Sequence, residues 1–466
     1  MPNNKYQTVN ILPSHKRIKA GKILLILFAL IFINVPFIHS QSVVKIGVAL
    51  PMFSESEDNT KKQLGNEILD GIKFALTEYS KNAPVKVTLE VMDTRRDPVT
   101  ANEVIKGFGE DESIIGVIGP VFSSELTESA VNGPQFKLPI VSPTATGDDL
   151  AENYNYVFQL NPSYEVRGKL MADYLIKRNG MKNFAIISEE AYGDNFRKHF
   201  EDEVKTMGGK ILIAQTYKKD PQSITDQINA IIKYIKENDL FINAANLNLT
   251  QKQKLESSGV RWSLIDSSVT LNMDVSIYYM FGKNAKKMVD TMNIKPYKLK
   301  PETTKFIQGV IDAIYIPISN PGEINVIVPQ LFSDGLSMYI AGTGDWNNEK
   351  ILEDNKVYLK NVVFESEYYP SDNDPEYAEL KENVKKSKFK LSKNFLFGYD
   401  TGKLIFKLIG DGAKSREQLN TALKNLVNYD AIKSKISLDY HGINSELNIL
   451  RYDDGIKLVE TYKLSK

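Results

Sequence analysis

Short, almost continuously apolar segments alternate with segments of helical periodicity in the 100 residues that follow residue 42. Val43–Leu50 (VVKIGVAL) is apolar along most of its length, as strands buried on both faces of a parallel sheet are. Apolar residues then recur at helical spacing over Glu67–Tyr79. The next expected elements are strands at Val85–Met92, Ile114–Ile118 and Pro139–Ser142, and helices over Pro98–Phe108 and from Ser123. This β-α-β order predicts a parallel sheet with right-handed crossovers.

The alternation resumes past Pro162 and fails over Glu237–Gly309, which is polar and rich in Asn and Lys. One sheet would not need so many units, so the sequence predicts an α/β protein of two doubly wound lobes joined by hinge strands. Crossings between the lobes are expected near Asn161–Ser163, Glu365–Ser371 and Tyr440. The expected domains are lobe I (42–162 plus 367–440), lobe II (163–366 plus 441–466) and an insertion in lobe II (237–309). The last 30 residues alternate apolar and polar residues, which predicts a β-meander.

Two of the expected strands end in small hydroxyl residues. Ser123 and Ser124 follow one strand at the first turn of a helix, and Ser142, Thr144 and Thr146 follow the next. Backbone N–H groups at a helix start have no partner in the helix, and the helix dipole favours an anion there, so we expect a carboxylate ligand. Ordinary N-capping by Ser123 and Ser124 remains an alternative. The separation of about 20 residues between the two strand ends suits a βαβ unit and favours the ligand site.

The N-terminus resembles a secretory signal. The first 40 residues contain five Lys or Arg and no acid, with an apolar run over Ile23–Val35 and a small residue at Ser40. We expect cleavage near Ser40–Ser42, which makes residues 1–41 a signal peptide and the protein periplasmic or secreted; an uncleaved anchor remains the alternative. Without those cations the chain has 53 basic and 58 acidic residues, so nothing indicates a nucleic-acid partner.

The sequence offers little catalytic chemistry. It has no Cys, which excludes disulfides, thiolate nucleophiles and a lipid-modified N-terminal Cys. Past the signal segment only His199 and His441 remain, far apart and expected to face solvent, so we expect no metal. We find no nucleophile elbow, P-loop or dinucleotide fingerprint, and therefore expect neither an enzyme nor a cofactor.

Eight segments carry a family resemblance. They are the opening strand with Pro51, GNEILDGIKFALTEY, VMDTRRDP, VIGPVFSS, LPIVSPTAT, NPSYEVRGKLMADYLIKRNGMKNFAIISEEAYGDNF, VIVPQLFSDGLSMYIAGTGDW and FGYDTGKL. In this order and spacing, from Val43 to about Tyr462 with the insertion excepted, the chain resembles the type I periplasmic binding proteins, in particular the branched-chain amino-acid-binding (leucine-binding-like) group. The resemblance implies that a small molecule, an amino acid or a similar solute, is held between two lobes and delivered to the membrane permease of an ABC transporter.

The same resemblance implies roles for individual residues. Ser123 would hold the ligand's α-carboxylate with Ser124 beside it, Thr144 would offer its carbonyl and Thr146 its hydroxyl, and Tyr192 would close over the ligand. The position that usually carries an acid or amide for the α-ammonium aligns with Gly344, so Asp345 is displaced by one residue. Ser319 and Phe53 are further lining candidates, Phe53 with a core or rim role as the alternative.

The insertion admits two interpretations. Its position before IDAIYIPIS and a PQL helix also resembles the lobes of penicillin-binding-protein activators, which implies an alternative role as an envelope regulator of a cell-wall synthase. The N-terminal repeats and lipidated Cys usual in those activators are missing. The polar composition favours a decorated, mobile loop of lobe II with no function of its own.

Overall fold

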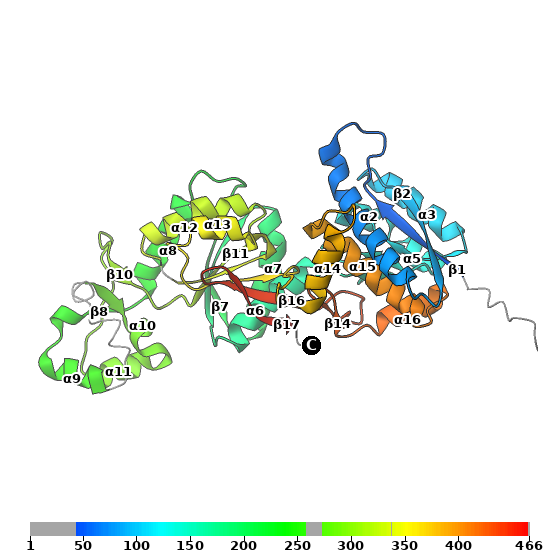
Figure 1. Cartoon of the computed structure of the whole chain (residues 1–466). Coiled ribbons are helices and arrows are strands. Elements are labelled where there is room, and N and C mark those ends of the chain that lie inside the picture. Colours follow the sequence, from blue (N-terminus) through cyan, green and yellow to red (C-terminus); the bar gives the residue numbers. More distant parts are fainter. Residues whose placement is uncertain (1–42, 258–272, 337, 465–466) are drawn as a thin grey trace, which may run out of the picture. The chain divides into compact units, whose positions relative to one another are not determined.

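The structure, a computed structural model, describes residues 43–257, 273–336 and 338–464, so the predicted signal segment lies outside the described residues. Two large sheets, each with helices, form the main body of the described chain (Figure 1). The predicted fold class is confirmed: the chain is an α/β protein of two doubly wound lobes.

The first sheet has five parallel strands in the order β2-β1-β3-β4-β5. Its strands are β1 (Val43–Leu50), β2 (Lys86–Asp93), β3 (Ile114–Ile118), β4 (Ile140–Ser142) and β5 (Val157–Gln159). The helices between them are α2 (Asn59–Ser80), α3 (Pro98–Glu110), α4 (Ser123–Ser129) and α5 (Asn132–Phe136). The helix predicted from Ser123 is thus in two short pieces, because Pro134 has no N–H to continue the ladder.

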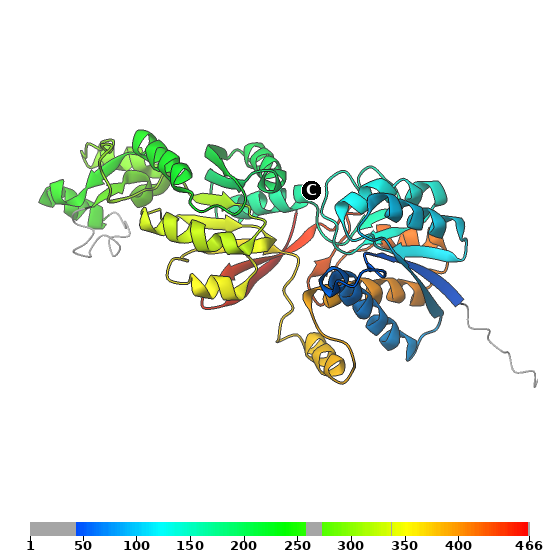
Figure 2. The same ribbon diagram turned by 90° about the horizontal axis from the view of Figure 1, so that it is seen from above.

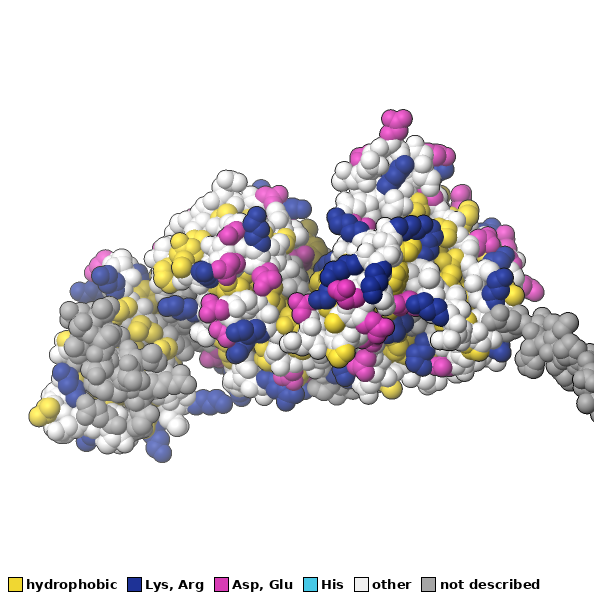
Figure 3. Space-filling model, viewed as in Figure 1, with side chains coloured by type: hydrophobic (Ala, Val, Ile, Leu, Met, Phe, Trp, Pro, Cys, Tyr) yellow, Lys and Arg dark blue, Asp and Glu magenta, His cyan; other side chains and the backbone are white. Residues whose placement is uncertain are grey.

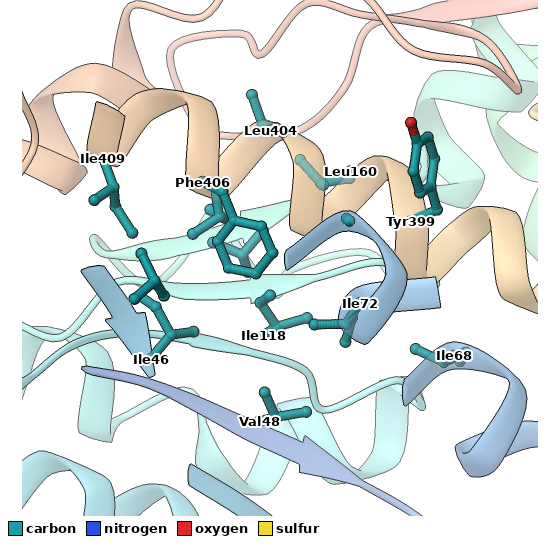
Figure 4. Packing of buried hydrophobic residues seen from close by; sticks show 14 of the residues in the cluster. Ile46, Val48, Ile68, Ile72, Ile118, Leu160, Tyr399, Leu404, Phe406 and Ile409 are labelled. Carbon is teal, nitrogen blue, oxygen red and sulfur yellow. The ribbon is translucent and has the colours of Figure 1, made fainter. Parts of the chain in front are cut away.

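Helices from late in the sequence complete this lobe. They are α14 (Pro375–Lys385), α15 (Lys393–Gly410) and α16 (Arg416–Lys424), followed by a small hairpin, β14 (Tyr429–Asp430) with β15 (Lys435–Ile436). In Figures 1 and 2 the orange α15 lies beside the blue α2. The contact is close because both helices present a glycine, so that a Cβ on Gly398 would overlap the carbonyl of Ile68. Figure 4 shows the resulting core, in which Ile46 and Ile118 of the sheet meet Phe406 of α15.

Arg416 ties α16 to the first sheet. Its guanidinium donates to five backbone carbonyls, those of Phe108, Gly109, Asp111, Ile114 and Phe136, at 2.7–3.2 Å. A guanidinium has five N–H donors in a fixed plane, so one side chain satisfies the ends of α3 and α5 together.

The second sheet has seven strands in the order β17-β16-β13-β12-β11-β6-β7. The strands are β6 (Asn183–Glu189), β7 (Lys210–Tyr217), β11 (Ala313–Ile316), β12 (Tyr339–Gly342), β13 (Val362–Ser366), β16 (Glu446–Tyr452) and β17 (Ile456–Lys463). Its helices are α6 (Tyr164–Lys177), α7 (Tyr192–Thr206), α8 (Thr225–Asn238), η5 (Pro321–Glu323), α12 (Ile324–Ser333), η6 (Gly344–Trp346) and α13 (Glu349–Asp354). The first five strands in chain order are parallel, and the predicted meander is the antiparallel pair β16–β17 at the sheet edge.

The chain passes between the two sheets at the three predicted places. β5 leads into α6 at residues 160–163, β13 leads towards α14 at 367–374, and residues 437–445 lead from β15 into β16. The sheets therefore take their strands and covering helices from the segments predicted for the two lobes, whose residue boundaries remain a prediction.

The insertion is a small folded unit, which corrects the expectation of a simple loop. Its described elements are β8 (Phe241–Asn243), η1 (Ala244–Asn246), α9 (Leu249–Ser257), β9 (Asp274–Ser276), α10 (Ile277–Phe281), η4 (Gly282–Asn284), α11 (Ala285–Thr291) and β10 (Phe306–Ile307). The strands form a separate sheet, and Ile242, Leu255, Ile277 and Val289 belong to a separate hydrophobic core. So small a unit needs only a few apolar side chains for its core, so the low apolar content of the segment did not indicate a folded unit in the sequence.

Candidate functional site

The two strand ends singled out in the sequence meet in the structure. β3 and β4 are adjacent and parallel, and α4 begins at Ser123 as predicted. The Ser123 hydroxyl accepts hydrogen bonds from the backbone N–H groups of Thr146 (3.2 Å) and Gly147 (2.9 Å). Ser123 therefore joins the two strand ends, and its hydroxyl already has partners inside the protein.

Thr144 is also bonded within the protein, whereas Thr146 faces a cavity. The Thr144 hydroxyl donates to the carbonyl of Val121 (2.6 Å), and its carbonyl accepts from the Asn161 amide (3.1 Å). Ser124 is exposed. Thr146 lines a cavity of about 180 Å³. The other lining residues are Asn161, Tyr164, Arg167, Tyr192, Phe196, Gly344, Asp345, Glu367 and Lys393.

Asp345 is the acid of this cavity. It lies in η6, at the end of β12, and its carboxylate accepts a 2.7 Å hydrogen bond from the hydroxyl of Tyr192, the first residue of α7. Burial raises the pKa of Asp345 to about 6, because the charged form loses solvation there. The one-residue displacement from Gly344 therefore leaves the carboxylate in the cavity wall.

Arg167 of α6 organises the floor of the cavity. Its guanidinium donates to Glu365 (2.7 Å), to Glu367 (2.8 Å) and to the side-chain oxygen Oδ1 of Asn161 (2.7 Å). Glu367 also pairs with Lys393 at 2.9 Å. Burial opposes the charge on Glu367, but Lys393 and Arg167 prevail and hold its pKa well below the usual range.

The charges of this cluster do not cancel. Glu365, Glu367 and Asp345 supply three carboxylates, while Arg167 and Lys393 supply two cations. Nearby, the buried Lys433 and Asp400 offset each other. Burial raises the pKa of Glu365 as well. With all of these groups ionised, one negative charge is left over, and a cavity of this kind favours a guest that carries one positive charge.

Gly344 is required by the packing around the ion cluster. Its amide donates to Glu365 (3.1 Å), and a Cβ at this position would lie 2.9 Å from the Glu367 carboxylate and 3.2 Å from the Arg167 guanidinium. The residue before Asp345 is small because the ion cluster lies directly beneath it.

Two predicted lining residues lie elsewhere. The backbone N–H of Ser319 donates to Glu189 (2.7 Å), while its hydroxyl is buried without a hydrogen-bond partner and does not line the cavity around Asp345. Phe53 lines a separate cavity of about 350 Å³, together with Phe122 and Arg96. The guanidinium of Arg96 lies 4.2 Å from the centre of the Phe122 ring.

Sequence reasoning missed Arg167, Glu367 and Lys393. A usable signal was present, because Glu365 and Glu367 occupy the end of an apolar strand at a predicted crossing. A carboxylate in such a strand requires a buried cationic partner. The sequence alone did not say that the partner would come from α6, about 200 residues earlier.

Both remaining histidines are paired, which corrects the expectation that they face solvent. His199 Nε2 lies 2.8 Å from the Asp148 carboxylate and its side chain is 15% exposed, while His441 lies 3.6 Å from Glu152. Across the described residues, no group of three or more His, Asp or Glu side chains is placed to hold a metal ion. Within the same residues, no helix is both long and apolar enough to span a bilayer.

Comparison with known proteins agrees with this architecture. Residues 43–237 match the family model described as periplasmic binding protein. The structure of the branched-chain amino acid transporter substrate binding protein LivJ from Streptococcus pneumoniae, in complex with isoleucine, superposes with a TM-score of 0.53 at 16% identity, covering 91% of this chain and 99% of that one. This chain has the type I periplasmic binding protein fold. A putative branched-chain amino acid ABC transporter protein from Rhodospirillum rubrum gives a TM-score of 0.63 at 14% identity, covering 91% of this chain and 100% of that one.

Part of the sequence also resembles receptors. The chain is 32% identical over 130 residues to metabotropic glutamate receptor 4 of Rattus norvegicus, covering 27% of this chain and 14% of the receptor. It is 22% identical over 183 residues to the probable metabotropic glutamate receptor mgl-1 of Caenorhabditis elegans, covering 36% of this chain and 18% of that protein. The chain therefore spans less than a fifth of the length of these curated relatives.

Proposed function

We propose that this protein is a secreted solute-binding protein that captures an amino acid, or a similar ammonium-bearing solute, and delivers it to the permease of an ABC transporter. The observation that carries the proposal is the half-buried carboxylate of Asp345, which accepts from Tyr192 in a small cavity that Thr146 also lines. Transport proteins of the same fold have been solved with isoleucine or leucine bound, and others with hydroxybenzoates bound, so the fold is compatible with both classes and the Asp345 carboxylate favours an amino acid.

In this proposal the ligand's two charged groups have separate anchors. Asp345 accepts from the ammonium, and Tyr192 keeps that carboxylate in place. The ligand's carboxylate lies near Thr146. The backbone N–H of Thr146 already donates to Ser123, so the donors to the ligand are the Thr146 hydroxyl and the N–H groups at the start of α4. Ser123 supports this site by accepting the N–H groups of Thr146 and Gly147, and its hydroxyl proton is a further donor for the carboxylate.

A thermal-shift panel tests the proposal. A ligand that binds only the native protein raises its melting temperature by mass action. The panel contains leucine, isoleucine and glutamate, with benzoate as a solute that lacks an ammonium. We expect at least one amino acid to raise the melting temperature and benzoate to leave it unchanged. Mass spectrometry of ligand that co-purifies with the protein identifies a solute outside the panel. No shift with any amino acid, and no co-purifying ammonium compound, would refute the proposal.

The folded insertion supports a second candidate, regulation of an envelope enzyme such as a cell-wall synthase. A unit with its own core can present a fixed surface, which a flexible loop cannot. Pull-down with the whole protein and with a variant that lacks 240–308 separates the candidates. A synthase captured only by the whole protein favours regulation, and an amino-acid ligand favours transport.

A further inference from the structure

The insertion carries a basic surface that the ligand cavity does not explain. Residues 277–300 contain six lysines and a single acid, Asp290, although the chain as a whole has equal numbers of basic and acidic residues. All six lysines are exposed. None of them forms an ion pair with another described residue.

In α10 (Ile277–Phe281) and α11 (Ala285–Thr291), one side of the segment packs on the core of the insertion and the other faces solvent. Ile277 of α10 and Ala285 and Val289 of α11 are buried in the core of the insertion. Lys283, Lys286 and Lys287 occupy the opposite positions and are exposed, as is Tyr279, which is 44% exposed. We call these four residues the basic face. In Figure 3 dark-blue and yellow side chains both reach the surface over the insertion.

The composition of the basic face indicates the kind of partner. Residues 277–300, which include the basic face, contain six lysines and no arginine. Arginine, with its planar fork of donors, is enriched at protein interfaces, where lysine is depleted. Lysines instead act as point charges towards a diffuse anionic surface, and tyrosine is favoured at the boundary between water and lipid.

We propose that the basic face binds a bilayer surface that carries anionic lipid headgroups. The lysines are attracted to the headgroups, and Tyr279 inserts its ring at the level of the headgroups. The binding is reversible and depends on salt, because no apolar segment of this face enters the bilayer deeply. The inference does not depend on the identity of the solute in the cavity.

Vesicle sedimentation of the full chain tests the proposal. The vesicles contain phosphatidylcholine alone or with 30 mol% phosphatidylglycerol. The test variant replaces Lys283, Lys286 and Lys287 with Gln. Its control replaces Lys381, Lys385 and Lys386 of the α14 region with Gln, which removes the same charge from another surface. All proteins share residues 1–42, so that segment cannot cause a difference between them.

We expect the wild-type protein and the control to bind anionic vesicles more tightly than neutral ones, and the test variant to lose about tenfold or more of that affinity. Raising the salt from 50 to 500 mM should release the wild-type protein. Equal binding of the test variant and the wild type overturns the proposal. Binding that shows no preference for anionic vesicles also overturns the proposal. An acidic protein would then be the next candidate partner of the basic face.

Discussion

Replacing Asp345 with Asn tests the proposed ammonium site most directly. The carboxylate is 2.7 Å from the Tyr192 hydroxyl in the cavity wall, and an Asn carbonyl oxygen can still accept that hydrogen bond. What the variant loses is the charge opposite the ligand's ammonium. Removing one partner of a buried charged hydrogen bond costs about 3 kcal/mol, which corresponds to about a hundredfold weaker binding.

The pH dependence of ligand affinity provides a second test of the role of Asp345. Since the pKa of Asp345 in the free protein is about 6, its carboxylate is ionised at pH 7.5 and largely protonated at pH 5. Affinity for an amino acid should therefore be constant above pH 7 and fall about tenfold per pH unit below 6. In the Asn variant this fall should be absent.

Lowering the pH should have opposite effects on binding and on folding: it weakens ligand binding but strengthens the contribution of Asp345 to folding stability. The stability of the ligand-free protein therefore serves as a control. A buried carboxyl whose pKa is raised on folding binds a proton more readily in the folded than in the unfolded chain, so it stabilises the protein at low pH and loses that contribution as pH rises towards 6. The ligand-free Asn variant should therefore unfold at the same or a higher urea concentration than the wild type at pH 8.

Calorimetric titration between pH 5 and 8 measures the binding. Wild-type affinity that is flat across this range would refute the assignment of Asp345.

Three further predictions concern the framework around the site. Arg167→Met should lower the free energy of unfolding by about 3–5 kcal/mol, because Glu365 and Glu367 lose a buried partner; an unchanged urea midpoint would contradict it. Arg416→Met should cost about 3 kcal/mol or more by leaving buried carbonyls without donors, and wild-type stability by chemical denaturation would refute that role. Gly398→Ala should destabilise through overlap with α2, whereas Gly107→Ala, in a helix with open space around it, should stabilise by up to about 1 kcal/mol. Equal effects in the two melting curves would contradict the close contact.

The strands and most helices could be predicted because their signal is local. Ile114–Ile118 is a strand with the predicted bounds, since five consecutive apolar residues between turns suit a buried parallel strand. Ser123 begins its helix as predicted, but the partners of its hydroxyl could not be foreseen, because they depend on how β4 continues after Ser142. The insertion was misjudged for a related reason, since a core of about seven side chains leaves little periodicity in the sequence.

The cavity could be predicted only in part. Thr146, Tyr192 and Asp345 were named from a resemblance to a family, and the structure brings all three to one cavity. The ion cluster beneath them joins α6 with the end of β13, a pairing between residues 198 and 200 positions apart. Long-range pairing of this kind is decided by topology, which local patterns do not encode.

The close packing of α2 against α15 bears on the order in which the protein acquires its structure during synthesis. The strands of the first sheet are complete at residue 159, yet the helices that cover one side of it are not made until residue 424. Until the ribosome has passed that point, Ile46, Ile118 and Ile72 lack the side chains that shield them from water. The N-terminal lobe is therefore translated first but cannot consolidate until α15 and α16 have been made, and a nascent chain released before α15 would expose an apolar surface for chaperones to bind.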